Sequence, residues 1–357
     1  MNLCFLGDFY LTKEKKYSSD FLDILRKSER IFINFEAPIK TPNAVFVQKV
    51  GATLAQDEKV INELKALGIT DLCLANNHYF DLGYSGAINS TLLLRENGFI
   101  THGINSKNEN SSINIINDKI AIINVCESEF GVSDIIGEKY GLMSVSDPLI
   151  YVKIAELKKQ YLHILLIVHA GKENTLTPLP QWKTIYRAFI KLGVSAVIAH
   201  HPHVPQYIEE YNDGFIFYSL GNFIMDYISN HRLSSIGLLI NLDFSSEKIK
   251  LTKKYIHHNK SKNEICLCNQ TQSELIDHLL KINFDKDISV DMSVYDNMYL
   301  KRSIMQYLPN FIYKIKYFRN RRNKVYDFLI HNIRFESHRY SQELYIHYLK
   351  NKKNKKK

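Results

Sequence analysis

Between residue 2 and about residue 260, short runs of β-branched and aromatic residues alternate with longer amphipathic stretches. In the longer stretches the apolar residues recur at helical spacing, whereas the short runs have the length and composition of strands. This alternation predicts a layered α/β domain rather than an all-α or all-β one. The runs that predict strands are Leu3–Leu6, Ile31–Asn34, Asp71–Leu74, Ile120–Val125, His163–Val168, Ser195–Ala199, Phe215–Ser219 and Gly237–Phe244. The stretches that predict helices are Ser19–Ser28, Glu58–Leu67, Ser85–Asn97, Pro148–Gln160 and Leu179–Leu192.

The chain changes character near residue 260, because Asn, Lys, Tyr and Arg dominate the remainder, including the basic runs 314–324 and 350–357. We expect residues 1–260 to form the α/β domain and residues 261–357 to form a helical, basic C-terminal region with a disordered tail. The net charge of +9 owes much to that region. A solvated helix face explains the basic charge of this region more simply than a surface that binds nucleic acid or an anionic membrane.

The chain has no stretch that approaches the ~20 apolar residues of a membrane-spanning helix. Its first eight residues also lack the basic segment and apolar run of a secretion signal. The sequence therefore predicts a cytoplasmic protein without a transmembrane span, one that could be peripheral to the inner membrane leaflet through its basic tail. Five cysteines, of which Cys4, Cys73 and Cys126 lie in apolar segments, indicate reduced thiols rather than a disulfide framework.

Six groups of polar residues follow predicted strands directly, at the position where open α/β sheets bind ligands. Each group alone has an ordinary explanation, since an Asp often caps a helix, an Asn pair often forms a turn and a lone His is often structural. The groups are Gly7-Asp8, Asn34-Phe35-Glu36, Asn76-Asn77-His78 with Asp81, His169-Ala170-Gly171-Lys172-Glu173, His200-His201-Pro202-His203 and Ser219-Leu220-Gly221-Asn222.

Taken together, these groups supply the ligands of a divalent-metal site. They offer two carboxylates, one amide oxygen and three imidazoles, at strand ends that one sheet would bring together: Asp8, Glu36, Asn77, His169, His201 and His203. Mixed nitrogen and oxygen ligands suit Mn²⁺, Fe²⁺ or Zn²⁺, whereas an all-oxygen set would favour Mg²⁺ or Ca²⁺. We therefore expect a divalent-metal site at this end of the domain.

The motif order GD, NxE, NNHxxDxG, HxGxE, HPHV and SLGNF resembles the CapA family of poly-γ-glutamate (capsule) synthesis, which belongs to the calcineurin-like metallophosphoesterase superfamily. The resemblance covers residues 1 to about 245 and implies a β-sandwich flanked by helices. It also implies two metal ions, the first held by Asp8, Glu36 and His203 and the second by Asn77, His169 and His201, with Glu36 bridging. His78 would be the acid.

Further residues have more than one interpretation. Asp81 could orient His78, or it could equally cap the helix that begins near Gly83. Five residues are interpreted as substrate contacts or as supports of the ligands, with His200 as a spacer beside the ligand pair: Asn34, Asn76, Glu173, His200 and Asn222. The chain departs from the superfamily at Tyr10, where an imidazole ligand is usual, and at Glu36, where an Asp is usual.

Two functions of different classes fit these residues. The first is a CapA-like metal-dependent hydrolase that acts on a phosphoester or on an amide bond of a polyglutamate-like polymer. The second is a non-catalytic assembly partner of a capsule or polymer synthase that binds an anionic polymer, a hypothesis that Tyr10 supports. The number of buried ligands favours the enzyme, because a scaffold has no physical need for them. Nucleic-acid processing is less favoured and would depend on Arg319, Arg321, Arg322 and Lys324.

Overall fold

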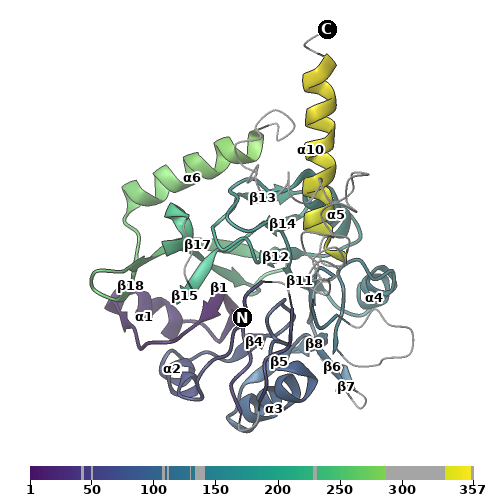
Figure 1. Cartoon of the computed structure of the whole chain (residues 1–357). Helices are drawn as coiled ribbons and strands as arrows, with labels where there is room; N and C mark the ends of the chain where they lie inside the picture. The colour runs from purple at the N-terminus through teal and green to yellow at the C-terminus, as the bar shows by residue number, and fades with distance from the viewer. Residues whose placement is uncertain are drawn as a thin grey trace, which may run out of the picture.

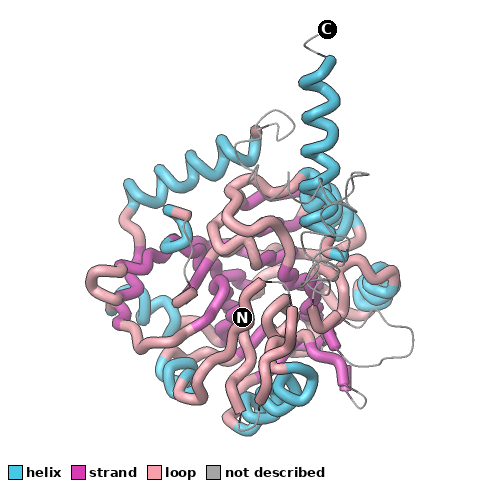
Figure 2. The backbone as a smooth tube through the Cα atoms, viewed as in Figure 1, coloured by secondary structure: helices cyan, strands magenta, loops and turns pink. Residues whose placement is uncertain are grey.

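Two β-sheets face each other across the centre of the molecule, and helices cover their outer faces (Figure 1; Figure 2). The computed structural model describes residues 1–41, 44–49, 51–106, 109–110, 112–128, 130–132, 141–227, 231–286 and 334–354. The first sheet has the spatial order β2 (Lys16–Tyr17), β18 (Glu264–Leu267), β17 (Lys250–Asn259), β16 (Ile236–Asp243), β1 (Asn2–Tyr10), β3 (Arg30–Phe35), β4 (Asp71–Cys73), β5 (Ile100–His102), and β15 (Asn222–Met225) also pairs with β1.

The second sheet has the order β13 (Ile208–Tyr211), β14 (Gly214–Phe217), β12 (Ala196–His200), β11 (His163–His169), β9 (Ile120–Cys126), β8 (Ile113–Ile116). A small third sheet contains β10 (Gly141–Leu142), β6 (Ile104–Ser106) and β7 (Glu109–Asn110). The strands β1, β3, β4 and β5 are parallel to one another, as are β9, β11, β12 and β14. Each sheet therefore gathers the carboxyl ends of its central strands at one edge.

Apolar side chains fill three layers. The layer between the sheets includes Phe5, Phe32 and Leu165, and Phe5 stacks on Phe32 with ring centroids 4.6 Å apart. The helices α1 (Ser19–Arg26), α2 (Val60–Ala66) and α3 (Gly83–Glu96) belong to the apolar layer on the outer face of the first sheet. The helices α4 (Leu149–Leu157) and α5 (Pro180–Lys191) belong to the corresponding layer of the second sheet. This burial is the main stabilising term of the fold.

All eight expected strands and all five expected helices are present, with shifted ends. The layered α/β architecture, with a sandwich of two sheets flanked by helices, is confirmed. One expectation is corrected: Asp8 does not follow the first strand, because β1 continues to Tyr10 and carries Asp8 at a register shift within it. Pairing of β1 with β15 and β3 explains the extension, since both flanks of the strand stay occupied.

The C-terminal region continues the first sheet before it becomes helical. The strand β18 lies beyond residue 260 and pairs with β17, so the chain crosses the expected domain boundary within a hairpin. The described helices that follow are α6 (Gln270–Asp285) and α10 (Glu336–Asn354), and α10 includes part of the run expected to be a disordered tail. The basic run 314–324 and residues 355–357 lie outside the described residues. The division into two domains stays a prediction.

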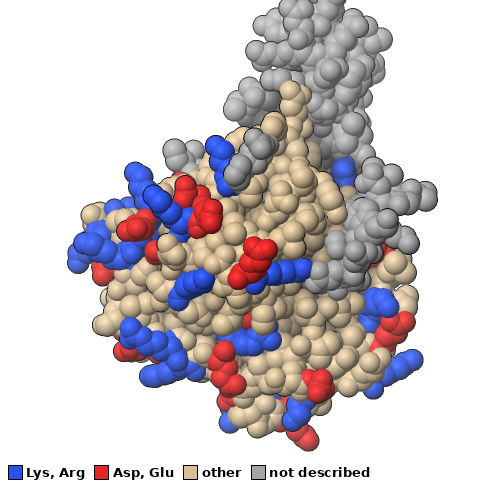
Figure 3. Space-filling view, turned by 90° about the horizontal axis from the view of Figure 1, so that it is seen from below, with Lys and Arg blue, Asp and Glu red and all other residues tan. Residues whose placement is uncertain are grey.

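The surface offers two observations on partners. None of the helices in the described ranges is long and apolar enough to cross a membrane. On the face seen in Figure 3, the Lys and Arg side chains of the described residues are interspersed with Asp and Glu. A mixed surface of this kind is typical of a solvated face.

A buried ionic cluster joins β4 to its neighbouring strands. The fully buried carboxylate of Asp71 accepts a hydrogen bond from Arg30 Nε at 2.8 Å and forms an ion pair with the same guanidinium. His102 Nε2 lies 2.7 Å from the same carboxylate. Burial raises the pKa of Asp71, but the hydrogen bonds from His102 and Arg30 outweigh burial and lower it.

Asp71→Asn is therefore expected to lower the free energy of unfolding at pH 7 by about 3 kcal/mol, because it removes the buried negative charge that pairs with the guanidinium of Arg30. The folded pKa lies below the unfolded value of about 3.9, so this stabilisation is present above that pH and is lost as pH falls through the folded pKa. Urea unfolding of both proteins at pH 7 and at about pH 3 checks the prediction. Equal stability at pH 7 would contradict it.

Candidate metal centre

Asp8 reaches the centre because two glycines let β1 approach the turn that precedes β15. A Cβ atom on Gly7 would lie 1.9 Å from Gly221 O, a distance that no side chain tolerates. The close approach allows Asp8 N to donate a hydrogen bond to Gly221 O at 2.9 Å. In the GD pair, the backbone approach therefore requires a glycine at position 7, and Asp8 supplies the carboxylate.

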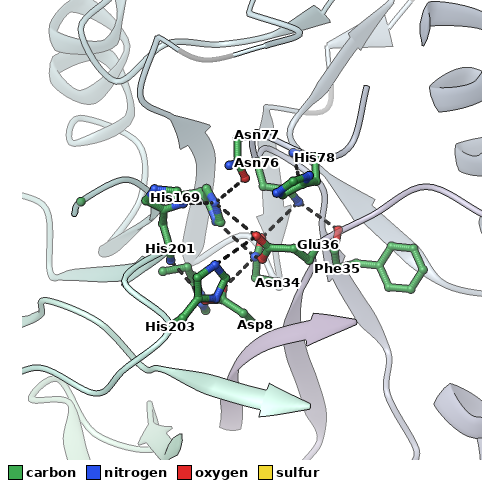
Figure 4. A network of polar contacts seen from close by, with 12 residues as sticks. Asp8, Asn34, Phe35, Glu36, Asn76, Asn77, His78, His169, His201 and His203 are labelled. Carbon is green, nitrogen blue, oxygen red and sulfur yellow. Dashed lines mark hydrogen bonds and ion pairs between the residues drawn. The ribbon is translucent and has the colours of Figure 1, made fainter. Parts of the chain in front are cut away.

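Asn34 ties the two carboxylates together. Its Nδ2 donates hydrogen bonds to Asp8 Oδ1 at 2.8 Å and to Glu36 Oε2 at 2.7 Å, and it lies 3.2 Å from His169 Nδ1 (Figure 4). Asn76 in turn donates to Phe35 O at 2.9 Å and to Asn34 Oδ1 at 3.3 Å. Both asparagines are buried. They orient Glu36 and Asp8, which agrees with the interpretation of Asn34 and Asn76 as supports of the ligands.

Three polar atoms converge on one nitrogen of His169, the last residue of β11. His169 Nε2 lies 3.0 Å from Asn77 Oδ1, 2.9 Å from His201 Nδ1 and 3.7 Å from Glu36 Oε1. A ring nitrogen carries at most one proton, so it cannot satisfy all three neighbours by hydrogen bonding. The arrangement is typical of ligand atoms that surround a common cation.

The His-Pro-His segment is held in an uncommon backbone conformation. His201 has φ 94° and His203 has φ 57°, both in the region that favours glycine. Conformations of this kind cost on the order of 1 kcal/mol each and are found mainly at functional sites. As a result both imidazoles reach the same cluster, since His201 meets His169 and His203 Nδ1 lies 3.2 Å from Asp8 Oδ2.

The charges of the cluster favour a bound cation. Burial and the charge of Asp8 raise the pKa of Glu36 well above its usual value. Burial also raises the pKa of Asp8, but hydrogen bonds from His200 and His203 outweigh it and hold that pKa well below the usual value. Burial lowers the pKa of His201 to about 4, so this imidazole is neutral, as a metal ligand must be.

His203 is the exception among these imidazoles. Burial lowers its pKa, but the hydrogen bond to Asp8 and the charges of Glu36 and Asp8 outweigh burial and raise the pKa to about 10. A protonated His203 then supplies the positive charge that the two carboxylates need. The same charge could come from a metal ion.

The donor set also passes a direct test of fit to a metal. Glu36 Oε1 is buried and has no hydrogen-bond partner among the described residues. It lies 3.7 Å from His169 Nε2 and 3.8 Å from His203 Nε2, too far for hydrogen bonds but close to the separation of two ligands that each lie ~2.1 Å from one ion. Two described groups keep their ligand atoms within 4.8 Å of one another, and Glu36 belongs to both: Glu36, His201 and His203; Asp8, Glu36 and His169.

His78 lies at the side of the cluster and is held by two residues from different segments. Its Nδ1 lies 2.7 Å from Asp81 Oδ2 and 3.3 Å from Lys49 Nζ. Lys49 is almost fully buried, forms an ion pair with Asp81 and donates a hydrogen bond to Asn77 O at 2.9 Å. Burial lowers the pKa of His78 against the opposing hydrogen bond from Asp81. The contact between Asp81 and His78 favours an orienting function for Asp81 over a helix cap. The other hydrogen bond that Asp81 Oδ2 accepts comes from Leu54 N at 2.6 Å, which does not belong to α3.

The remaining predicted residues lie around the cluster. His200 is buried, with Nδ1 3.4 Å from Asp8 Oδ1, so its side chain contacts a proposed ligand instead of serving only as a spacer. Asn222 Oδ1 lies 3.0 Å from His203 Nδ1, and its amide nitrogen donates to His203 O at 3.1 Å. Glu173 follows the strand that ends at His169 and is exposed. Tyr10 donates its hydroxyl hydrogen to Ala55 O at 3.5 Å.

Two residues near the centre were not predicted from the sequence. Lys49 lies in an irregular segment without periodicity, so only the folded chain brings its ammonium group to Asp81. Glu127 directly follows β9 and accepts a hydrogen bond from Gly171 N at 3.1 Å. Its position after a strand is the signal that could have identified it, because the other site residues were predicted from that position.

An open pocket adjoins the cluster at Asn222. It has a volume of about 280 Å³, and its lining includes Asn222, Lys15, His258 and Lys260. Lys15 is paired with Asp226, which also lines the pocket. The pocket offers room for part of a substrate beside the residues that hold His203.

Residues 9–227 match the sequence model of a family described as bacterial capsule synthesis protein PGA_cap. The capsule biosynthesis protein CapA of Bacillus anthracis is 26% identical over 246 residues, which cover 63% of this chain and 60% of that protein. The PGA biosynthesis protein CapA of Bacillus subtilis (strain 168) is 28% identical over 246 residues, which cover 63% of each chain. The chain thus spans less than two thirds of the length of these curated relatives.

Among solved structures, a 5'-nucleotidase precursor from Thermus thermophilus aligns with a TM-score of 0.41 and 12% identity. The alignment covers 79% of this chain and 59% of that chain.

Proposed function

The chain belongs to the PGA_cap family of bacterial capsule synthesis proteins, and from this premise we propose that it is a metal-dependent hydrolase of capsule polymer synthesis. The proposed bond is a phosphoester or an amide of a polyglutamate-like polymer. The observation that carries the proposal is the buried Glu36 Oε1, which has no hydrogen-bond partner in the described part of the chain and faces the ring nitrogens of two histidines. A buried carboxylate oxygen without a partner is costly, and a divalent cation relieves that cost.

We assign the ligands as the resemblance implies, with Asp8, Glu36 and His203 on one side and Asn77, His169 and His201 on the other. Glu36 would serve both ions, and its place in both described ligand groups supports this, although those groups combine Glu36 with His201 and His203 and with Asp8 and His169. The mixed nitrogen and oxygen donors favour Mn²⁺, Fe²⁺ or Zn²⁺. When bound, two such ions polarise the scissile group and lower the pKa of a coordinated water.

The residues beside the ligands supply orientation and a proton. Asn34 holds the carboxylates of Asp8 and Glu36 in place, so the ligands are preorganised. Asp81 fixes the proton of His78 on Nδ1, and an anionic substrate beside the ring would raise its pKa and allow Nε2 to donate a proton to the leaving group. The pocket beside Asn222 would accommodate the substrate.

Metal loading tests the proposal. Purified protein dialysed against Mn²⁺ is expected to retain about two ions per chain by elemental analysis, because Glu36 takes part in two ligand groups. Hydrolysis is then screened with bis(p-nitrophenyl) phosphate and with a γ-glutamyl peptide. Absence of bound metal would contradict the proposal and favour the non-catalytic assembly partner. Bound metal without hydrolysis of either probe would count against the two proposed bonds.

A further inference from the structure

The first turn of α10 is fixed to the loop after β9 by two buried carboxylates, each of which accepts hydrogen bonds from the serine that follows the other. Glu127 accepts hydrogen bonds from Ser337 N at 2.8 Å and from Ser337 Oγ at 3.0 Å. In the opposite direction, Glu336 accepts from Ser128 N at 2.8 Å and from Ser128 Oγ at 2.7 Å. Both carboxylates are almost completely buried. We call this reciprocal set of Glu127, Ser128, Glu336 and Ser337 the α10 clamp.

The α10 clamp extends directly to the loop that carries a proposed ligand. Glu127 Oε1, which binds Ser337, also accepts a hydrogen bond from Gly171 N at 3.1 Å, and Glu127 N donates to His169 O at 3.0 Å. Gly171 has φ +136°, and a Cβ there would lie 3.0 Å from Pro202 Cγ. The loop after His169 is thus fixed between Glu127 on one side and the His-Pro-His segment on the other.

The same end of α10 also reaches the residues around His78. The ring of Phe335 meets the ring of Phe130 edge to face at 5.6 Å, and Lys49 Nζ lies 5.1 Å from the centre of the Phe130 ring. Lys49 forms the ion pair with Asp81, whose carboxylate contacts His78. Two separate chains of contacts therefore connect the start of α10 with the metal centre, one through the His169 loop and one through His78.

Packing alone does not require so polar a joint. Replacing buried ionic groups by apolar ones of similar volume is often neutral or stabilising, so a purely structural contact could use apolar side chains. Ser337 Oγ additionally accepts a hydrogen bond from Trp182 Nε1 of α5 at 2.9 Å, and the base of α10 lies against α5 in Figure 1. Each hydrogen bond in the α10 clamp has a preferred direction, so the clamp fixes the position of α10 relative to the loop after β9.

We infer that Glu127 and Ser337 are positioning residues of the metal centre, through which the start of α10 holds the His169 loop in its ligand geometry. The inference rests on the proposed function for its metal-binding part. It assigns a task to a helix that lies outside residues 9–227, the part of the chain that matches the family. The C-terminal region is then a component of the site rather than an appendage.

The test compares Ser337→Ala and Glu127→Gln with Ser341→Ala in the full-length protein. Ser341 is a matched control, because it is a buried serine one turn further along α10 whose hydroxyl binds Ser337 O within the helix. Two quantities are measured for each protein: hydrogen exchange in peptides that cover residues 169–173, and the Kd for Mn²⁺. Melting temperatures report whether all variants are folded.

The two clamp variants are expected to show faster exchange at Gly171 and about a tenfold higher Kd at unchanged stoichiometry, whereas Ser341→Ala resembles the wild type. Wild-type exchange and Kd in both clamp variants would overturn the inference, as would equal losses in Ser341→Ala. If the wild type binds no Mn²⁺, the proposed function fails. Exchange at Gly171 then still decides whether the clamp fixes the loop.

Discussion

Glu36→Gln is expected to reduce the Mn²⁺ content of the loaded protein from about two ions per chain to fewer than one, with about a 100-fold or greater loss of affinity. Even residues that only support metal ligands change affinity by about 10–100-fold, and Glu36 would be a ligand of both ions. The substitution keeps the shape of the side chain, and the amide oxygen can still accept from Asn34 Nδ2. The lost charge is therefore the main change, and elemental analysis and Mn²⁺ titration measure its effect.

Without metal, Glu36→Gln is expected to be at least as stable as the wild type. Burial and the charge of Asp8 raise the pKa of Glu36, so the ionised carboxylate destabilises the metal-free fold and a neutral amide relieves it. The metal-free melting temperature should equal or exceed that of the wild type. At a free Mn²⁺ concentration ~100 times Kd, the wild type should gain about 2.7 kcal/mol per site, and the variant should gain much less.

Glu209→Gln provides the control for this experiment. Glu209 lies on β13, at the edge of the second sheet, and is also a largely buried carboxylate, but it pairs with Arg187 and accepts a hydrogen bond from the Tyr218 hydroxyl. Its substitution should lower stability and leave the Mn²⁺ content unchanged. A normal Mn²⁺ content in Glu36→Gln would exclude Glu36 as a ligand and with it the proposed bridging position.

Much of the fold could be predicted because its central strands are buried on both faces. Strands such as β11 and β12 are continuous apolar runs of strand length, a pattern that leaves little ambiguity. The half-exposed strand β17 carries mostly polar side chains and gave no such signal. The place of Asp8 inside β1 depends on the approach of Gly221 from a distant segment. The spacing of apolar residues along the chain cannot reveal such an approach.

The site residues could be predicted where they directly follow predicted strands. The residues of ligand type at five predicted strand ends lie close together in the structure, and the family match confirms the resemblance to CapA. Lys49 and Ser337 could not be found in this way, because each reaches the site only through tertiary contacts. Which ion each imidazole holds stays a prediction, since His169 and His203 both lie close to Glu36.

His78→Ala is expected to lower kcat by about 100-fold or more while the Mn²⁺ content stays at the wild-type value. His78 belongs to neither described ligand group, yet Asp81 and Lys49 hold its ring beside the ligand Asn77. The variant would therefore bind metal and substrate but lack the group that supplies the proton. Turnover is measured on whichever probe the wild type hydrolyses, together with elemental analysis of the same samples.

The matched control is His163→Ala, because His163 is a buried histidine at the opposite end of the strand that carries His169. It should lower neither kcat nor Mn²⁺ content, although loss of its contact with Phe244 should lower the melting temperature. Full activity of His78→Ala would remove the proposed acid and leave catalysis to the metal ligands. Loss of Mn²⁺ from His78→Ala would instead indicate that the Lys49, Asp81 and His78 contacts serve chiefly to position Asn77, whose backbone oxygen Lys49 already binds.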